Sequence, residues 1–279
     1  MIIIAAGRSG TKMLRDILIR LQGFGTWPCD EINYIWRCGN REHPTDELQE
    51  VHARPEVIRY IRNEFKRLGD RQRLETIVEK TCANSLRVGF VNAVFPHARF
   101  IFLIRDGRDV TASAASRWKG GSSLAYLLRK ARFIPRQDLA FYLSRYACNY
   151  WHRFRNQERR LATWGPRFAG LDDLAARLDL EEVCARQWEA CVLQAAAGLA
   201  RIPDQDVYRL RYEDFVAHPA ALLEELGRFF GLRISAEDCA SWTRSVSRDR
   251  LGSWKLLLKS PEKISQLLLP TLRQFGYEA

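Results

Sequence analysis

The side chains best suited to bind an anion are grouped close to the start of the chain. They are Arg8, Ser9, Thr11 and Lys12, with Gly10 among them. Gly7 and Gly10 allow the backbone angles with which successive N–H groups point into one hollow. Guanidinium, ammonium, hydroxyl and amide donors around one hollow suit a phosphate-like group. This stretch is therefore predicted to be an anion-binding loop.

The elements on either side of this loop are a predicted strand and a predicted helix. Residues 2–4 are isoleucines, and residues 13–21 carry apolar side chains at helical spacing. A helix that begins near Thr11 adds its unpaired amides and the positive end of its dipole to the hollow. A Walker A loop would need four residues between its glycines, whereas two separate Gly7 from Gly10. A degenerate ATP loop and a strand-to-helix turn without ligand stay open as alternatives.

A second group of anion-binding side chains follows an apolar run. Residues 100–104 are predicted to form a buried parallel strand, with Arg105 at its carboxyl end and Ser113 on the helix that follows. A planar bidentate donor and a hydroxyl group that face one hollow would hold a phosphate. Asp106 and Asp109 are expected to cap that helix or to hold an arginine. The alternative is that Arg105 only pairs with Asp109.

Two further positions carry groups that could take part in a reaction. Residues 76–79 are predicted to form a strand, and Lys80 leaves its carboxyl end, where ligands gather in open α/β sheets. Asp30 and Glu31 are adjacent acids in a loop among Trp and Tyr residues. Taken alone, such acids are more often solvated or helix caps.

Composition points to one ordinary globular α/β domain. The chain has 279 residues, of which 47% are hydrophobic and 28% charged, and residues 1–279 show no linker or repeat. The net charge of +11 suits a polyanionic ligand or an acidic partner. No apolar stretch is long enough to span a membrane and no signal peptide is visible, which favours a cytoplasmic protein. The seven cysteines form no C-x-x-C pair and the five histidines no ligand cluster, so we expect no metal.

Residues 119–180 are the least patterned part of the sequence. Arginines alternate there with aromatic residues, which can be a sign of nucleic-acid binding. Apolar residues also recur at helical spacing, as in Leu139, Tyr142, Leu143 and Tyr146. We therefore interpret this segment as a helical insertion that contributes to an acceptor pocket, with most of its arginines on solvated helix faces.

Two stretches together resemble a known family. Residues 7–12 are similar to the 5′-phosphosulfate loop, and residues 95–113 to the 3′-phosphate motif, of sulfotransferases that use 3′-phosphoadenosine 5′-phosphosulfate (PAPS). The pattern is closest to bacterial and tyrosylprotein members. The resemblance implies a three-layer, P-loop-like α/β fold with a central parallel sheet flanked by helices. It also implies in-line transfer of a sulfuryl group from PAPS to an acceptor hydroxyl or amine, with 3′-phosphoadenosine 5′-phosphate (PAP) as product and no metal.

The resemblance also implies roles for individual residues. Arg105 and Ser113 would hold the 3′-phosphate, and Lys80 together with Arg8 would act on the sulfuryl group as it is transferred. Lys12 stands where a hydroxyl residue is commoner in the family. The run Arg250, Gly252, Ser253 and Trp254 resembles the cofactor lid near the C-terminus, although the Arg-Lys-Gly of cytosolic members is absent.

The general base is predicted by the same resemblance. Cytosolic members use a histidine that follows the lysine of the second strand, but here Cys82, Ala83 and Asn84 occupy that stretch. Tyrosylprotein and heparan types place a glutamate on the loop after the first helix, and Glu31 matches that position best, with Asp30 next. The acceptor could be a small molecule, glycan, lipid or peptide, and the oligomeric state stays open.

Two other functions compete with this interpretation. A P-loop-like kinase or NTPase would need magnesium and an acidic residue after an apolar strand. Residues 100–104 are followed by Arg105 instead, which fits phosphate binding. A basic protein that binds nucleic acid through residues 119–180 would leave both anion loops without a purpose.

Overall fold

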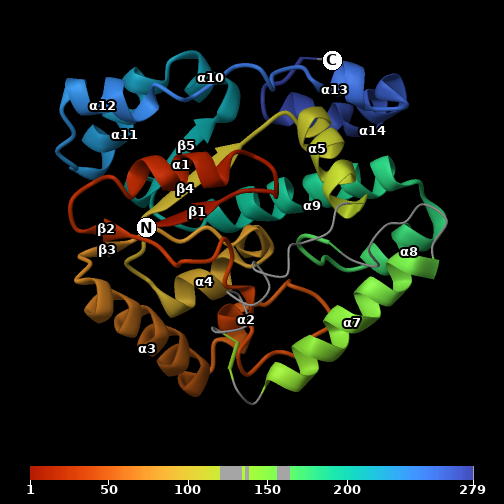
Figure 1. Cartoon of the computed structure of the whole chain (residues 1–279), viewed down its shortest axis with the longest axis horizontal. Coiled ribbons are helices and arrows are strands. Elements are labelled where there is room, and N and C mark those ends of the chain that lie inside the picture. The colour runs from red at the N-terminus through yellow and green to blue at the C-terminus, as the bar shows by residue number, and fades with distance from the viewer. Residues whose placement is uncertain (120–133, 136–137, 156–163, 279) are drawn as a thin grey trace.

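The molecule is organised around a parallel β-sheet, seen in a computed structural model that describes residues 1–119, 134–135, 138–155 and 164–278. Strands β1 (Ile2–Ile4), β4 (Phe100–Ile104) and β5 (Val207–Arg211) pair in the order β1-β4-β5. Two short strands, β2 (Phe24–Gly25) and β3 (Thr76–Ile77), pair with each other. Glu79 continues from β3 and bonds to the backbone beside β1, which joins both sheets into one layer (Figure 1).

Successive side chains of the strands alternate between two hydrophobic cores. Ile2, Ile4 and Phe102 belong to one cluster, while Ile3 and Ile101 belong to the other. This follows from the period of two residues that places neighbouring side chains on opposite faces of a sheet. Because both faces are covered, the strands are apolar throughout, as expected of a parallel sheet.

Helices cover both faces of the sheet and complete three layers (Figure 1). Apolar side chains of α1, α10, α11 and α12 join one core, and those of α2, α3, α4, α9 and α14 join the other. The helices among the described residues are α1 (Thr11–Leu18), α2 (Asn33–Trp36), α3 (Pro55–Gln72), α4 (Val88–Val94), α5 (Gly107–Lys119), α7 (Leu139–Arg155), α8 (Leu171–Arg177), α9 (Leu180–Leu199), α10 (Tyr212–Ala217), α11 (Pro219–Phe230), α12 (Ala236–Thr243), α13 (Trp254–Leu257) and α14 (Pro261–Gln274), with 3₁₀ turns η1 (Glu50–His52), η2 (Cys82–Leu86) and η4 (Asp204–Asp206). The predicted three-layer α/β fold is thereby confirmed.

The shorter elements differ from their predicted bounds. The predicted strand 76–79 pairs with β2 only at Thr76 and Ile77. The apolar pattern of residues 85–95 predicts a helix, but the structure has the 3₁₀ turn η2 followed by α4. Within η2, Ser85 donates its hydroxyl proton to the Cys82 carbonyl at 2.7 Å, which closes a tight turn. The alternation of charged and apolar residues over 43–73 predicts a surface helix, but the structure has the 3₁₀ turn η1 there and then α3 from Pro55, which stands at the first position of α3, where proline is favoured.

Features expected to be absent can be stated only for the described part of the chain. No helix in it is long and apolar enough to cross a membrane. Within those same ranges, no group of three or more histidine, cysteine or acidic side chains could hold a metal ion. Of the insertion 119–180, residues 120–133, 136–137 and 156–163 lie outside the described residues, and the rest contributes α7 and α8.

Candidate active site

The predicted anion-binding loop lies between β1 and the first turn of α1. Gly10 has φ 91°, a left-handed conformation that glycine adopts without strain. A Cβ at Gly10 would lie 2.6 Å from the Tyr212 ring, so contact with α10 also requires glycine there. Arg8 has φ 73° and donates from Nε to Ser113 Oγ at 2.9 Å. The loop and α5 therefore meet directly.

Arg105 lies at the carboxyl end of β4, beside this loop. Its guanidinium donates to the Arg8 carbonyl at 3.3 Å and to the Arg250 carbonyl at 2.7 Å. It also pairs with Asp109 at 3.4 Å and lies over the Tyr212 ring, 4.3 Å from the ring centre. The sequence-predicted residues Arg8, Arg105 and Ser113 are thus brought to one edge of the sheet, and Asp109 holds an arginine as expected.

The predicted C-terminal lid is held against this edge by the buried carboxylate of Asp109. That carboxylate accepts hydrogen bonds from Gly252 N at 3.0 Å, Ser253 Oγ at 3.1 Å and Trp254 N at 3.0 Å. The Arg250 carbonyl thus contacts Arg105, whereas Gly252 and Ser253 contact Asp109, and the Ser253 hydroxyl already donates its proton to that carboxylate.

The residues that follow α14 contact the start of α5, next to Arg105. Arg108 donates to the Glu278 carbonyl at 3.0 Å and pairs with Asp106 at 2.8 Å. Glu213 accepts from the Asp106 N–H at 2.9 Å and from the Tyr277 hydroxyl at 2.8 Å. The first turn of α5 is thereby fixed next to Arg105.

Unsatisfied buried atoms at this edge of the sheet fit an anionic ligand. Ser9 Oγ and Arg105 Nε are buried and have no hydrogen-bond partner in the part of the chain that the structure describes. Buried polar atoms without a partner are rare in native proteins, and each one needs an explanation. Burial and then the charge of Arg117 lower the pKa of Arg8 from its usual value, which reflects the gathering of positive charge around the loop. A phosphate would satisfy these donors and offset that charge.

Lys80 and Glu31 meet on the other side of the loop. Lys80 Nζ lies 3.9 Å from Glu31 Oε1. The Lys80 side chain is 7% exposed, whereas that of Glu31 is 32% exposed and has only this ion partner among the described residues. The predicted catalytic lysine and base are therefore paired, and the carboxylate of Glu31 keeps access to solvent.

Asp30 has a different environment from its neighbour. It pairs with Arg15 at 3.2 Å and with Lys12 at 4.0 Å. Burial alone would raise the pKa of Asp30, but the charges of Lys80 and Lys12 outweigh burial and hold that pKa below its usual value. The Lys12 side chain, predicted to serve the phosphate loop, therefore lies near an acid of the next loop.

Buried polar groups fix the backbone on both sides of the Lys80–Glu31 pair. Thr81, next to Lys80, accepts a hydrogen bond from the N–H of Ile32, next to Glu31, at 3.1 Å. Thr81 N donates to Glu79 Oε1 at 2.8 Å, and Asn84 Nδ2 donates to Glu79 Oε2 at 2.9 Å. These contacts tie the loop of the lysine to the loop of the acid.

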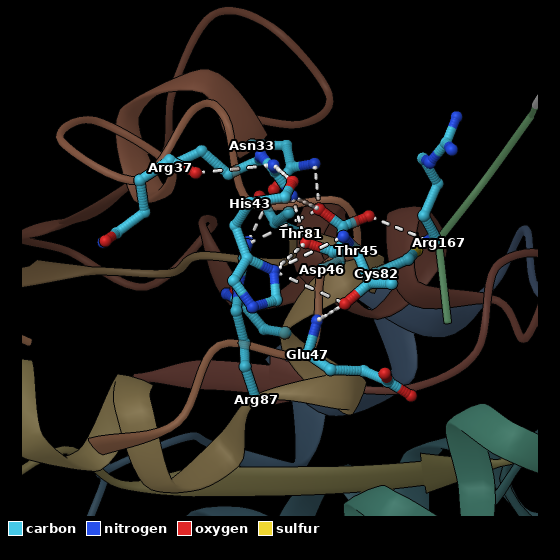
Figure 2. Close-up of polar contacts among 12 residues, drawn as sticks. Asn33, Arg37, His43, Thr45, Asp46, Glu47, Thr81, Cys82, Arg87 and Arg167 are labelled. Atoms are coloured by element: carbon cyan, nitrogen blue, oxygen red, sulfur yellow. Dashed lines mark hydrogen bonds and ion pairs between the residues drawn. The ribbon is translucent and has the colours of Figure 1, made fainter. Parts of the chain in front are cut away.

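A polar network around Asp46 joins the residues that follow Glu31 to those that follow Lys80 (Figure 2). The Asp46 carboxylate accepts from Asn33 at 3.0 Å, from Arg37 at 2.9 Å and from Arg167 N at 2.8 Å. Arg87 donates to Asn33 at 2.6 Å and lies 3.8 Å from Asp46. Sequence reasoning missed this network, because its members are isolated polar residues in segments without a pattern.

The aromatic residues near the acids belong to the interior. Trp27, Tyr34 and Trp36 are all buried in the core cluster that includes α2 and α3. The Trp36 ring packs edge-on against Phe65 and Phe90. These rings support the loop that carries Glu31.

Comparison with known proteins gives a consistent result. The model of the sulfotransferase family matches residues 1–163. The structure resembles the sulfotransferase domain from the curacin biosynthetic pathway, with 13% identity and a TM-score of 0.57 over 99% of this chain and 97% of that one. It resembles STF9 from Mycobacterium avium, with 13% identity and a TM-score of 0.55 over 100% of this chain and 77% of that one. It also resembles mouse SULT7A1 complexed with PAP, with 14% identity and a TM-score of 0.51 over 98% of this chain and 84% of that one. A comparison with curated sequences gave no match.

Proposed function

Because this chain belongs to the sulfotransferase family and is a sulfuryl-transfer enzyme, we propose that its donor is PAPS, held in the crevice between residues 7–12 and the end of β4. In this proposal Arg105 and Ser113 bind the 3′-phosphate, and the amides of the loop with Ser9 and Thr11 bind the 5′-phosphosulfate. Arg250, Gly252 and Ser253 close over the nucleotide. The neighbour complexed with PAP supports this choice of nucleotide.

One observation carries the proposal. Arg8, Arg105 and Ser113 come from three different parts of the chain, yet Arg8 contacts both of the others, and Ser9 Oγ and Arg105 Nε are buried beside them with no partner among the described residues. An ATP site would need acidic groups for magnesium at this edge. The acids beside Arg105 are already engaged, because Asp109 holds the lid and Asp106 holds Arg108.

The reaction that this arrangement supports is an in-line displacement at sulfur. An oxygen or nitrogen of the acceptor forms the new bond to sulfur, while the bond from sulfur to the 5′-phosphate oxygen breaks. Negative charge grows on that phosphate oxygen, and Lys80, Arg8 and the loop amides are placed to neutralise it. The loop also holds the donor in position, which removes much of the entropic cost of the encounter.

We propose that Glu31 is the general base that takes the proton of the acceptor. Its carboxylate is half-open to solvent and lies beside Lys80, so an acceptor that reaches the sulfuryl group would meet it. Asp30 is less suited to this role, since two cations engage it and its pKa is depressed. Residues 119–180 are proposed to form part of the acceptor pocket. A single domain and a cytoplasmic location stay predictions from the sequence.

Calorimetry tests the choice of donor. PAP, ATP and a single-stranded oligonucleotide are titrated into the wild type, into Arg105→Ala and into Arg177→Ala, an exposed arginine on α8. PAP should bind the wild type far better than the other two ligands. Arg105→Ala should weaken PAP by about 1.5–3 kcal/mol, the scale of hydrogen bonds to a charged group. Unchanged PAP affinity in Arg105→Ala, or tighter binding of ATP, would overturn the proposal.

A further inference from the structure

A cavity lies outside the crevice described above, at the loop that follows α2. Its volume is about 600 Å³, and its walls include Asn40, Arg41, His43, His52 and Asp138. Binding sites for small molecules have volumes of roughly 300–1,000 Å³, so this cavity is large enough for one. Neither the loop residues nor Asp138 were among the residues that the sequence singled out.

An unsatisfied carboxylate oxygen marks the cavity as a site. Asp138 is only 2% exposed. Its Oδ1 accepts from Arg41 Nη1 at 2.7 Å, but its Oδ2 is buried and has no hydrogen-bond partner among the described residues. A buried acceptor without a donor is costly, because it has given up its hydrogen bonds to water. A ligand with a hydrogen-bond donor would remove that cost.

The other polar groups of the wall narrow the kind of ligand. His52 Nδ1 accepts from the Gln49 N–H at 2.9 Å, so the neutral ring carries its proton on Nε2 and can donate. Arg41 also donates, while Asp138 and Glu42 accept. A hydroxyl group both donates and accepts, and it therefore matches such a mixed wall. An anion would be repelled by Asp138 and Glu42, and an ammonium group has no acceptor for the donors of Arg41 and His52.

The wall is held in shape by Arg37 from within. Its guanidinium donates to the carbonyls of His43 and Thr45, and to that of Arg41 at 3.1 Å. It also bonds to Asp46 at 2.9 Å, which anchors the loop to the buried network (Figure 2). A wall that is already ordered costs little conformational entropy when a ligand binds.

The cavity is also close to the proposed reaction centre along the chain. Only α2 and short connections separate Glu31 from Gly39, which limits their Cα atoms to at most about 20 Å apart. A molecule with several linked rings could reach from one to the other. We propose that this cavity binds the hydroxyl-rich part of the acceptor, and that the acceptor is therefore a sugar or a glycan. The assignment of this ligand as acceptor rests on the proposed function.

The test uses neutral disaccharides as probes and measures binding by saturation-transfer NMR. Maltose, cellobiose and lactose are titrated to about 20 mM, the range of weak, millimolar binding. Spermidine serves as the ammonium probe. Asp138→Asn keeps the shape of the side chain but replaces the free acceptor by a donor. Asp204→Asn is the matched control, since Asp204 pairs with Arg209 on the surface, away from the cavity.

At least one disaccharide should bind the wild type and Asp204→Asn alike, and it should bind Asp138→Asn at least tenfold more weakly. PAP affinity should stay within twofold in all three proteins. If Asp138→Asn does not fold, His52→Ala removes a donor from the half-buried wall and should weaken the disaccharide at least threefold. If the wild type binds a disaccharide but does not bind PAP, the assignment of the donor is refuted, whereas the assignment of the cavity is not.

Three results would overturn the cavity assignment. One is that no disaccharide binds the wild type up to the highest concentration. Another is equal binding by the wild type, Asp138→Asn and His52→Ala. The third is that spermidine binds in place of the sugars and is lost in Asp138→Asn, which would make the cavity a cation site.

Discussion

The two sides of the reaction centre are built on different principles. On the donor side, defined by residues 7–12, Arg105, Asp109 and Ser113, the groups that would touch the nucleotide contact one another directly. On the acceptor side, defined by Glu31, Lys80 and their supports Thr81 and Asp46, the reactive pair is held through its neighbours. The difference suggests that donor affinity depends on contact residues, whereas the acceptor side also depends, for its folded structure, on residues that touch no substrate.

The largest effect should follow from a change on the acceptor side. Glu31→Gln keeps the shape of the side chain and removes its basicity, so kcat should fall by roughly 10²–10⁴-fold. Asp30→Asn is the control and should lower kcat by less than about tenfold, because its engaged carboxylate is a weak base. PAPS-dependent sulfation of an accepted substrate measures both. A fully active Glu31→Gln enzyme would assign the base to another residue.

The supporting network should matter chiefly for folding. Asp46→Asn leaves Arg37 and Arg87 buried with a neutral partner, and removal of one partner from a buried pair costs about 3–5 kcal/mol. Denaturant unfolding followed by circular dichroism gives the change in the free energy of unfolding. Asp172→Asn, which breaks the exposed pair with Arg167, should cost less than about 1 kcal/mol. A similar loss in both variants would contradict a supporting role for Asp46.

The carboxylate of Asp46 should make the free energy of unfolding depend on pH. Burial alone would raise the pKa of Asp46, but the charges of Arg87 and Arg37 outweigh burial and hold that pKa below its usual 3.8. The ionised form is therefore favoured in the folded state. Its contribution is complete above about pH 5 and is lost as the pH falls through 4 toward the folded pKa. Unfolding curves from pH 7 to pH 3 should converge for the wild type and Asp46→Asn. Parallel curves would exclude this contribution.

A substitution of Lys80 should lower turnover without a comparable loss of donor affinity. Its charge matters most when the phosphate is leaving, so Lys80→Ala should lower kcat by roughly 10²–10³-fold. PAP has no sulfuryl group, and its affinity should change by less than about threefold. Kinetics and calorimetry on the same preparation compare the two effects. Weaker PAP binding with an unchanged kcat would make Lys80 a residue of the donor side.

The smallest effect should come from the lid on the donor side. Asp109→Asn weakens the hydrogen bonds to Gly252 and Trp254. PAP affinity should then fall by about 3–10-fold, since one or two hydrogen bonds are each worth near 1 kcal/mol. The dissociation rate of PAP should rise by the same factor. A change confined to the association rate would argue against a lid that retains the nucleotide.

The donor side could be predicted because its residues stand in short, continuous stretches. The strand at residues 100–104 has its predicted bounds, since a buried parallel strand requires an unbroken or nearly unbroken apolar run. Arg105 and Ser113 follow from that strand at fixed spacing. Asp109 was expected to hold an arginine and does so.

The acceptor side could not be predicted to the same extent. Asp46, Arg87 and Asp138 are buried charges, and burial of a charge is possible only once its partner is in place. Some of those partners lie far along the chain, as for Arg41 and Asp138, which are 97 residues apart. The helix α2 spans one turn and is too short to show a period. Only the position of Lys80 after a predicted strand and the adjacency of Asp30 and Glu31 drew attention to this side.

The C-terminal lid around Arg250 also affects the order in which parts of the protein can fold. Arg105 donates a hydrogen bond to the carbonyl of Arg250, 145 residues further on. Arg108 donates one to the carbonyl of Glu278, 170 residues further on. Closing such long loops costs chain entropy before any contact repays it, and contacts of this kind form late in folding. During synthesis, the phosphate loop and β4 leave the ribosome long before the segment that covers them. A nascent chain would therefore present an open, strongly basic edge until its last helices emerge.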